Sequence, residues 1–496
     1  MKKQTIITKS AYLNALKCPK LLWIDRNDKK RIPPPNASQQ RIFDQGSEVG
    51  ELAKKLYPGG IDVPYAQGMF FENIEETRKL LSSRKVLFEA GILEGDIYSR
   101  VDILKPSGRD KWDIIEVKSS AGMNEIYLHD IAFQKHCCEK SGLKIDRCFL
   151  LHINNQYVKC GEIDPAGFFE EHEVTGEIDA YIYGIEGRID KMRKTISREA
   201  CPEIEIGPYC KEPYECAMIP ECWKDLPEDN IFTLYNYGPK KAFPLYKAGI
   251  KTIRDMPEAE LGPKQIIQKK CEETGKIYID KTAIGEFLRR IRYPVCFMDF
   301  ETINPGIPFF DGTRPYQRIP FQFSAHIRRS PGGETEHYGF LAKDARDPRE
   351  RLLLELERVL GTDGTVMVYN RGFEESVLGE LGEVFPEHRT RINGIQGRII
   401  DLLEPFRGFS YYVPSQRGSA SMKKVLPAVT GKGYEDMDIA AGGDASALYF
   451  YATYGAGTPE ERDKIYSDLE KYCALDTEGM VWLLDEVVRS TGYNSK

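Results

Sequence analysis

The chain has 496 residues, which is enough for two or three domains that each bury their own core. With 41% hydrophobic and 29% charged residues, it has the composition of an ordinary globular protein, and this excludes a disordered chain. Its net charge of −7 argues against a protein that coats DNA passively. It does not argue against an enzyme with an acidic metal site, because bound cations reverse the local sign.

The N-terminal segment contains lysines but no apolar run, so we predict no signal peptide. No stretch reaches the roughly eighteen uninterrupted apolar residues of a membrane span. We therefore expect no membrane partner and a cytoplasmic location. Twelve cysteines in a cytoplasmic chain favour metal or redox chemistry over disulfides.

Residues 1–225 form the first predicted domain, and their pattern belongs to the α/β class. Strand-like runs at 86–104, 112–120 and 147–154 surround a helical stretch at 125–142. Strands, a helix and a further strand in this order are typical of an α/β fold.

Residues 226–290 are mostly helical and are predicted to form a linker. Within them, the sequence LYKAGIKTIRDMPEAEL at 245–261 predicts two short helices around a glycine turn. It loosely resembles a helix-hairpin-helix element, which binds the DNA backbone, but helices that pack into a core are the preferred interpretation. Residues 291–496 begin with a buried strand, YPVCFMDF, and alternate strands with helices, which predicts a second α/β domain.

An Asp and a Glu-x-Lys end two successive strands of the first domain. Asp102 ends one apolar run, and Glu116 and Lys118 end the next. Side chains two residues apart on a strand share a face, so Glu116 and Lys118 point at the same place. Two carboxylates can hold Mg²⁺ or Mn²⁺, and an ammonium beside them can orient a water molecule that attacks a phosphodiester. An edge strand with a surface Glu–Lys pair is the alternative interpretation.

With Gln134 on the helix that follows, this pattern resembles the PD-(D/E)xK nuclease domain of the RecB family. The resemblance implies that Asp102 and Glu116 bind metal. It also implies that Lys118 is catalytic and that Gln134 contributes to the site.

The chain departs from this family at one position. The family usually places a metal-binding His at the end of a G-x-x-x-H element in an early helix. Here the segment GSEVGELA has Gly50 at that place, which leaves Glu48 or Glu51 as the substitutes. The departure predicts weaker or differently arranged metal binding.

Three cysteines are clustered in GPYCKEPYECAMIPECW, and a fourth lies near the N-terminus. They are Cys210, Cys216, Cys222 and Cys18. Four thiolates can hold either Zn²⁺ or a [4Fe–4S] cluster, and the close CxxC pairs of zinc ribbons are absent here. The arrangement resembles the iron–sulfur staple of RecB-like nucleases, which implies a [4Fe–4S] cluster that ties together distant parts of the domain. Zn²⁺ is the alternative metal, and Cys201 is the alternative fourth ligand.

A second set of acidic residues lies in the last domain. They are Asp299 and Glu301 in FMDFET, Glu374 after the strand TVMVYN, Asp401 in IIDLLEPF and Asp476 in YCALD. Carboxylates gathered in one place repel one another and become protonated unless cations are bound. A phosphodiesterase that uses two metal ions needs such a group.

The order of these acids resembles the DEDD family of 3′–5′ exonucleases, which have an RNase H-like fold. Asp299 and Glu301 match its first motif, and the N-x-x-F-acid pattern that ends at Glu374 matches its second. Tyr472 and Asp476, one helical turn apart, match its third.

This resemblance implies that the acids, including Asp401, bind Mg²⁺ or Mn²⁺ and that Tyr472 orients the attacking water. Glu374 departs from the family, which has Asp there, and its longer side chain predicts a shifted second metal. A decayed or structural RNase H-like domain is the alternative interpretation.

Together the chain resembles a bacterial family in which an iron–sulfur RecB-like nuclease is fused to a DEDD exonuclease-like domain. This predicts a metal-dependent nuclease with two active sites that acts on single-stranded DNA. A nucleic-acid-binding scaffold for repair or defence, with one or both sites inactive, and an RNA-processing nuclease are the alternatives. The sequence leaves open DNA versus RNA, endo- versus exonucleolytic cutting, the pathway, the oligomeric state and whether a partner helicase delivers the strand.

Overall fold

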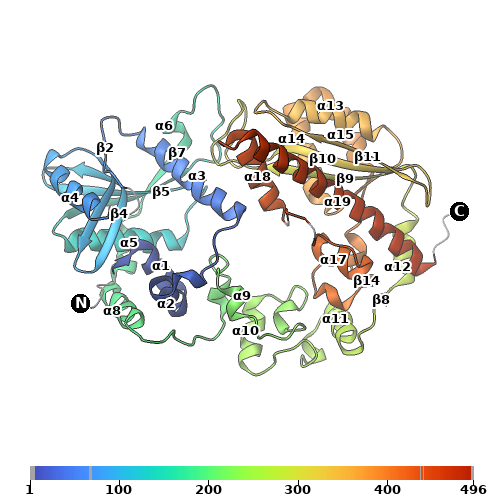
Figure 1. The fold of residues 1–496 in the computed structure, drawn as a ribbon, viewed down its shortest axis with the longest axis horizontal. Coiled ribbons are helices and arrows are strands. Elements are labelled where there is room, and N and C mark those ends of the chain that lie inside the picture. The colour runs from blue at the N-terminus through green and yellow to red at the C-terminus, as the bar shows by residue number, and fades with distance from the viewer. Residues whose placement is uncertain (1–5, 66–69, 436, 440, 493–496) are drawn as a thin grey trace. The chain divides into compact units, whose positions relative to one another are not determined.

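The structure is a computed structural model that describes residues 6–65, 70–435, 437–439 and 441–492. The chain divides into two compact units, which are Met1–Lys224 with Pro305–Gln317, and Asp225–Asn304 with Arg318–Lys496. Each unit combines helices with a mixed sheet (Figure 1), which confirms the predicted α/β class. The predicted linker is part of the second unit.

The first unit is built on a sheet with the neighbour order β2-β3-β4-β5-β6-β7, and β1 pairs with β4. The strands are β1 (Ile7–Thr8), β2 (Ile61–Asp62), β3 (Leu87–Glu94), β4 (Ile97–Ser107), β5 (Lys111–Lys118), β6 (Lys144–Ile153) and β7 (Phe169–Glu173). β3, β4 and β5 are antiparallel neighbours, β6 runs parallel to β5, and β7 returns antiparallel to β6.

Helices cover both faces of this sheet. They are α1 (Lys9–Lys17), α2 (Pro19–Asn27), α3 (Ala37–Lys54), α4 (Phe70–Leu80), α5 (Glu125–Lys140), α6 (Pro165–Phe168), α7 (Thr175–Ile182), α8 (Ile185–Ile196) and α9 (Ile219–Cys222). Side chains of α1, α5, α7 and α8 form the core on one face, and side chains of α3 pack against the other face.

A segment far along the chain completes the second of these cores. Ile307 and Tyr316 pack against the cluster that contains Val49, and the backbone N–H of Gly306 donates to Gln45 at 2.8 Å. Lys159 binds Asp311 at 2.6 Å. These contacts explain why residues 305–317, predicted as part of the last domain, belong to the first unit.

The second unit contains a sheet with the neighbour order β11-β10-β9-β12-β13 and a small sheet of β8 and β14. The strands are β8 (Tyr278–Ile279), β9 (Val295–Ile303), β10 (Ile319–Arg328), β11 (Thr335–Leu341), β12 (Thr365–Val368), β13 (Ile399–Asp401) and β14 (Tyr411–Tyr412). β9, β10 and β11 are antiparallel neighbours, whereas β12 and β13 continue parallel to β9.

Two helical layers enclose this sheet. The helices are α10 (Pro239–Lys247), α11 (Pro263–Thr274), α12 (Lys281–Leu288), α13 (Arg349–Leu360), α14 (Arg371–Val384), α15 (Arg389–Gln396), α16 (Glu404–Arg407), α17 (Met422–Thr430), α18 (Gly442–Tyr454) and α19 (Pro459–Thr491). α13, α14 and α15 pack on one face, and α12, α17 and α19 pack on the other. β9 therefore lies in the middle of the sheet, between two cores.

The two short helices predicted at 245–261 do not both form, so that prediction is wrong. α10 ends at Lys247, Gly249 follows with a φ of +94°, and only a 3₁₀ turn at Glu258–Glu260 comes after it. Thr252 pairs instead with Asn230, and its hydroxyl binds Asp255 at 2.7 Å. The segment contributes to a local apolar cluster, as the core-packing interpretation expected.

Candidate metal sites

Three carboxylates of the second unit converge at one point. Asp299 and Glu301 come from β9, and Asp476 comes from α19. Each offers an oxygen atom within 4.8 Å of the others, and Glu301 is only 8% exposed. This spacing suits ligands of shared divalent cations, which prefer carboxylate oxygens.

The local sequence explains why these carboxylates meet. On β9, Val295, Phe297, Asp299 and Glu301 alternate onto one face, where the apolar members pack with α12, α17 and α19. The apolar face of α19 covers the same side of the sheet, and Asp476 faces β9 from that helix. Asp299 and Glu301 therefore follow the apolar residues on this face of β9, at the end of the strand beyond the core.

Three further side chains surround this group. The Tyr434 hydroxyl donates a hydrogen bond to Asp476, and so does the Tyr472 hydroxyl. The Lys423 ammonium lies over the Tyr472 ring at 5.2 Å and interacts with Asp476 and Glu301. All but Tyr434 line a cavity of about 850 Å³. Sequence reasoning missed Tyr434 and Lys423, although Lys423 lies in the segment SMKKVLPAV that precedes the last motif.

Burial and mutual repulsion make this site costly without cations. Burial and then Asp476 raise the pKa of Asp299 well above its usual range, and burial, Asp299 and Asp476 do the same for Glu301. Burial raises the pKa of Asp476 to about 6, although the Tyr434 hydrogen bond opposes it. Lys423 is the cation that lowers the pKa of two of these groups. The donor set therefore fits Mg²⁺ or Mn²⁺.

Glu374 lies beside this group, at the start of α14. It shares a hydrogen bond with Asp299, and burial and then Asp299 raise its pKa to about 10. Its Oε2 atom is buried and has no hydrogen-bond partner among the described residues. A buried oxygen without a partner is expensive, so a cation at this edge of the site would satisfy it.

Asp401 is not part of the converging group. Its Oδ1 atom accepts the backbone N–H of Asn370 at 2.9 Å and that of Leu403 at 3.0 Å, and Arg407 lies 3.5 Å from Oδ2. It therefore joins the ends of β12 and β13 and orients the start of α14. Asp401 thus lies outside the group of Asp299, Glu301 and Asp476 and close enough to Glu374 to raise its pKa.

We expect metal removal to make the stability of the protein depend on pH. The pKa of Asp476 is about 6 in the folded protein and 3.8 ordinarily, so the folded state keeps a proton that the unfolded state releases. Stability without metal should therefore fall as pH rises from about 4 to about 6. Calorimetry in chelator and in excess Mn²⁺ checks this, since cations displace these protons and should reverse the slope. The same dependence of stability on pH in chelator and in Mn²⁺ would contradict a metal site at these acids.

The first unit brings Asp102 and Glu116 together on paired strands. Asp102 lies on β4 and accepts the backbone N–H of Val117 on β5 at 2.9 Å. Lys118 binds Glu116 at 2.6 Å, and Gln134 of α5 donates to the other oxygen of Glu116. The acidic pair, the lysine and the helical glutamine that the sequence singled out therefore share one site.

Two residues of this site were missed from the sequence. Asp130 lies one turn before Gln134 on α5 and binds Lys118 at 2.7 Å. Lys9, at the start of α1, lies 2.9 Å from Glu116 and 3.7 Å from both Asp102 and Asp130. Helical spacing could have indicated Asp130, whereas nothing in the sequence links Lys9 to a strand more than a hundred residues away.

Lysines, rather than carboxylates alone, dominate the electrostatics of this site. Burial would raise the pKa of Glu116, but Lys118 and Lys9 lower it. Burial would likewise lower the pKa of Lys9, but the carboxylates around it raise it. Burial and then Glu116 raise the pKa of Asp102 to about 7. The site is thus partly neutralised by its own lysines, and Lys9 must move or share the site if a cation binds between Asp102 and Glu116.

A cavity of about 940 Å³ lies over this group and includes Glu51 but not Glu48. Glu48 instead binds Arg41 at 2.7 and 2.9 Å. Of the two substitutes for the missing histidine, only Glu51 lines this cavity, and its carboxylate binds Lys54 at 2.6 Å. Glu89 of β3 also lines the cavity, with a φ of +57° that residues other than glycine seldom adopt.

The four predicted cluster ligands gather in one place in the first unit. Cys216 is buried with Leu21 and Ile24, and Cys18, Cys201 and Cys222 pack against them. Burial raises the pKa of Cys18, and Cys216 and Cys210 raise it further; Cys210 also acts on Cys222. All of these thiols are free.

The four thiols could hold a [4Fe–4S] cluster or a single metal ion. Among the described residues, no three of these sulfur atoms lie within 4.8 Å of one another. A cubane binds one cysteine at each of four irons, so its ligands lie farther apart than ligands of one Zn²⁺. Lys20 hydrogen-bonds Cys222 and Arg31 hydrogen-bonds Cys201, which supplies positive charge to a thiolate cluster.

Comparisons with known proteins match parts of the chain. The family model described as a domain of unknown function (DUF2779) matches residues 296–421, which run from β9 to the residue before α17. The chain is 22% identical to the uncharacterized protein MG366 of Mycoplasma genitalium over 204 residues, or 37% of this chain. That match spans 30% of the relative's length. The matched family region contains Asp299, Glu301 and Glu374 but ends before Asp476.

No helix among the described residues combines the length and the apolar character that crossing a membrane requires. Residues 1–5, which belong to the segment tested for a signal peptide, lie outside the described residues.

Proposed function

We propose that this protein is a metal-dependent nuclease that hydrolyses phosphodiester bonds of single-stranded DNA. The observation that carries the proposal is the convergence of Asp299, Glu301 and Asp476 in a cavity where burial and repulsion raise their pKa values. Such a group must either keep protons or bind cations, and perturbed carboxylates in a cleft are typical of active sites.

The strand order of the second unit supports an RNase H-like fold for this site. The order β11-β10-β9-β12-β13, with an antiparallel first half and a parallel second half, is the one expected for that fold. β9 is its central strand and carries Asp299 and Glu301, as the DEDD resemblance implies. The sheet of the first unit, with Asp102 and Glu116 on adjacent strands, likewise supports a PD-(D/E)xK-like domain.

Asp299, Glu301, Asp476 and Glu374 would hold Mg²⁺ or Mn²⁺, with Glu374 at the edge of the group. When bound, such cations draw charge from the phosphate and lower the pKa of water. Burial and Asp476 raise the pKa of Tyr472, so its hydroxyl keeps its proton and can orient a nearby water. Lys423 can attract a phosphate oxygen into the cavity.

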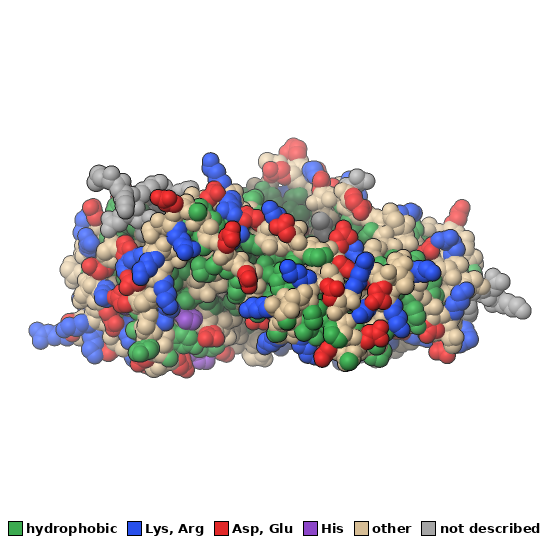
Figure 2. Space-filling view, turned by 90° about the horizontal axis from the view of Figure 1, so that it is seen from below, with side chains coloured by type: hydrophobic (Ala, Val, Ile, Leu, Met, Phe, Trp, Pro, Cys, Tyr) green, Lys and Arg blue, Asp and Glu red, His purple; other side chains and the backbone are tan. Residues whose placement is uncertain are grey.

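The cavity favours an unpaired strand. Tyr235, Tyr369 and Phe373 line it together with the acids, and aromatic rings offer stacking surfaces to exposed bases. On the face drawn in Figure 2, basic and acidic side chains are interspersed and neither sign gathers alone. On this face, affinity for the strand is therefore not expected from a broad basic surface.

Lys9 favours a second candidate function for the first unit. Its ammonium lies among Asp102, Glu116 and Asp130, where it competes with a cation for the same oxygens. A site neutralised in this way would bind nucleic acid without cutting it, as the scaffold alternative requires. The second unit would then carry all of the cleavage.

One assay tests the proposed function. The full chain, purified without air, should degrade single strands in the presence of Mn²⁺ and stop when a chelator is added. Strands labelled at the 5′ or the 3′ end, made of DNA or of RNA, report polarity and sugar preference together. Intact strands of both kinds after prolonged incubation with Mn²⁺ would refute the proposal.

We expect the protein purified without air to be brown and to contain about four iron and four acid-labile sulfide atoms per chain. Cys18→Ser should lose the colour and lower the melting temperature, because the link between α1 and the segment of Cys210 is broken. Cys160→Ser is the matched control, since Cys160 is exposed and outside this group. A protein without iron that loses one zinc equivalent on the Cys18→Ser substitution would replace the iron–sulfur assignment.

A further inference from the structure

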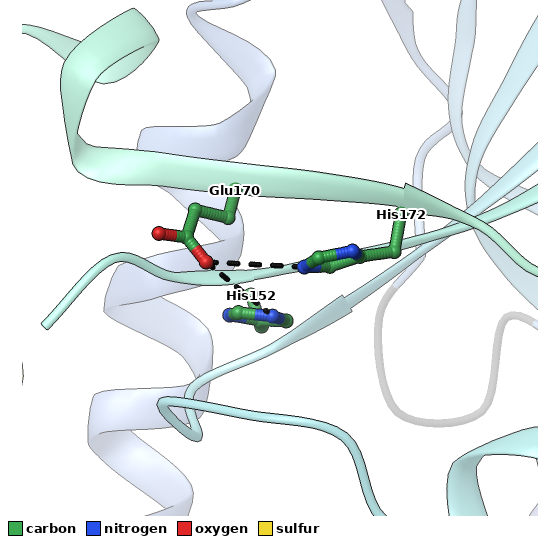
Figure 3. A group of neighbouring side chains, drawn as sticks. All are labelled: His152, Glu170 and His172. Carbon is green, nitrogen blue, oxygen red and sulfur yellow. Dashed lines mark ion pairs between the residues drawn. The ribbon is translucent and has the colours of Figure 1, made fainter.

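Two histidines and a glutamate form a third group of possible metal ligands in the first unit. His152 lies on β6, and Glu170 and His172 lie on β7 (Figure 3). One ligand atom from each lies within 4.8 Å of the others. We propose that these residues bind one Zn²⁺ ion, in a site separate from the carboxylate groups and the cysteines described above.

The strand register explains how the group forms. His152 is the antiparallel partner of Glu170, and His172 lies two residues further along β7, so all three side chains share one face. β7 is the last strand in the neighbour order of this sheet. The group therefore lies at an edge, where Glu170 and His172 keep almost half of their side-chain surface exposed.

The distances suit metal ligands better than hydrogen bonds. Nε2 of His172 lies 3.8 Å and Nε2 of His152 lies 4.0 Å from the same oxygen of Glu170, as the dashed lines in Figure 3 show. Both distances exceed those of a hydrogen bond. Ligand atoms around a tetrahedral Zn²⁺ are separated by roughly 3.3 Å, given bonds of about 2.0–2.1 Å, so small side-chain rotations would close the site.

His152 is already oriented as a metal ligand. It is only 3% exposed, and its Nδ1 lies 3.1 Å from the backbone carbonyl of Ile153, to which the N–H can donate. This bond leaves the lone pair on Nε2, the atom that faces Glu170. Histidines that bind metals usually donate their other ring N–H to such an acceptor.

The chemistry of the donors favours a transition metal over Mg²⁺. Two imidazoles and one carboxylate suit Zn²⁺ and also Fe²⁺, whereas Mg²⁺ prefers oxygen ligands alone. Three protein ligands leave a position open to solvent, as in catalytic rather than structural zinc sites. Lys118 lies opposite His152 on β5, but its ammonium is bound to Glu116 and Asp130 and so does not occupy the group.

The test counts the zinc bound by the full chain in excess Mg²⁺. The cysteines and whatever they bind after purification are left unchanged in every variant. Competition with a coloured chelator should show one tight equivalent fewer in His172→Ala than in the parent protein. Glu170→Gln keeps the size of the side chain and should weaken this equivalent by more than the 10–100-fold that outer-shell substitutions cost.

Glu171→Gln is the matched control, because Glu171 is adjacent on β7 but points to the other face, toward Tyr57. It should bind as much zinc as the parent. Equal zinc content in the parent and in His172→Ala would overturn the proposal, and so would an equal loss in Glu171→Gln. Because the measurement is zinc binding rather than cleavage, its outcome is independent of the proposed nuclease activity.

Discussion

Replacing Asp299 by asparagine should reduce 3′-end degradation by about 10²–10³-fold, the scale of losing a group that stabilises charge in the transition state. Asp299 is the acid that Glu301, Glu374 and Asp476 all surround, either by close approach or by a hydrogen bond. An amide of the same shape keeps the packing but removes the charge that holds the cations. Release of nucleotides from 5′-labelled single strands measures the effect.

The same substitution should stabilise the metal-free protein, and this separates lost chemistry from lost folding. Asparagine relieves the repulsion that raises the pKa values of Glu301 and Glu374. The melting temperature in chelator should therefore rise, by roughly 2–4 °C for each kcal/mol gained in a domain of this size. In Mn²⁺ the parent should be the more stable protein, because only it binds the cations fully.

Asp463→Asn is the control for this experiment. Asp463 lies on α19, the helix that also carries Asp476, but it is exposed to solvent. We expect unchanged cleavage and an unchanged melting temperature in both buffers. If Asp299→Asn cleaves as fast as this control, the acidic group of the second unit is not the exonuclease site.

The converging acids could be predicted because each lies in a strong local pattern. Asp299 and Glu301 interrupt the apolar face of a buried strand, and Tyr472 and Asp476 share a face of one helix. Such periodicities depend only on neighbouring residues, so the sequence contains them. That Asp476 meets β9 depends on the resemblance to the DEDD family, since no local pattern links residues so far apart.

The sequence could not predict contacts between segments that are far apart in the chain. Lys9 enters the first site because β1 pairs with β4 and places the start of α1 above Glu116. The segment 305–317 joins the first unit because Ile307 and Tyr316 find an apolar face there. The metal-binding role of Asp401 stays a prediction, but the sequence does not indicate that its Oδ1 atom also accepts backbone N–H groups of Asn370 and Leu403. Each outcome depends on tertiary structure.

Replacing Lys118 by methionine in the Asp299→Asn protein should remove the remaining cleavage, by about 10²–10³-fold. Asp299→Asn leaves only the first unit active, so this background isolates it. Lys118 binds both Glu116 and Asp130. Burial alone would lower the pKa of Lys118, but these two acids raise it above its usual value. Its ammonium therefore stays charged at neutral pH, ready to orient water or to stabilise developing charge on phosphate.

Lys111→Met in the same background is the matched control for Lys118→Met. Lys111 lies at the other end of β5, and its ion pair with Asp146 at 2.8 Å is exposed. Exposed pairs contribute little to stability, so this variant should keep its activity and its fold. If the Lys118 and Lys111 variants cleave equally, Lys118 has no catalytic role.

If the Asp299→Asn protein itself shows no cleavage, the lysines neutralise the first site and the scaffold alternative holds for that unit. Adding Lys9→Met would then decide between these outcomes, because removing the competing ammonium should increase Mn²⁺ binding at Asp102 and Glu116.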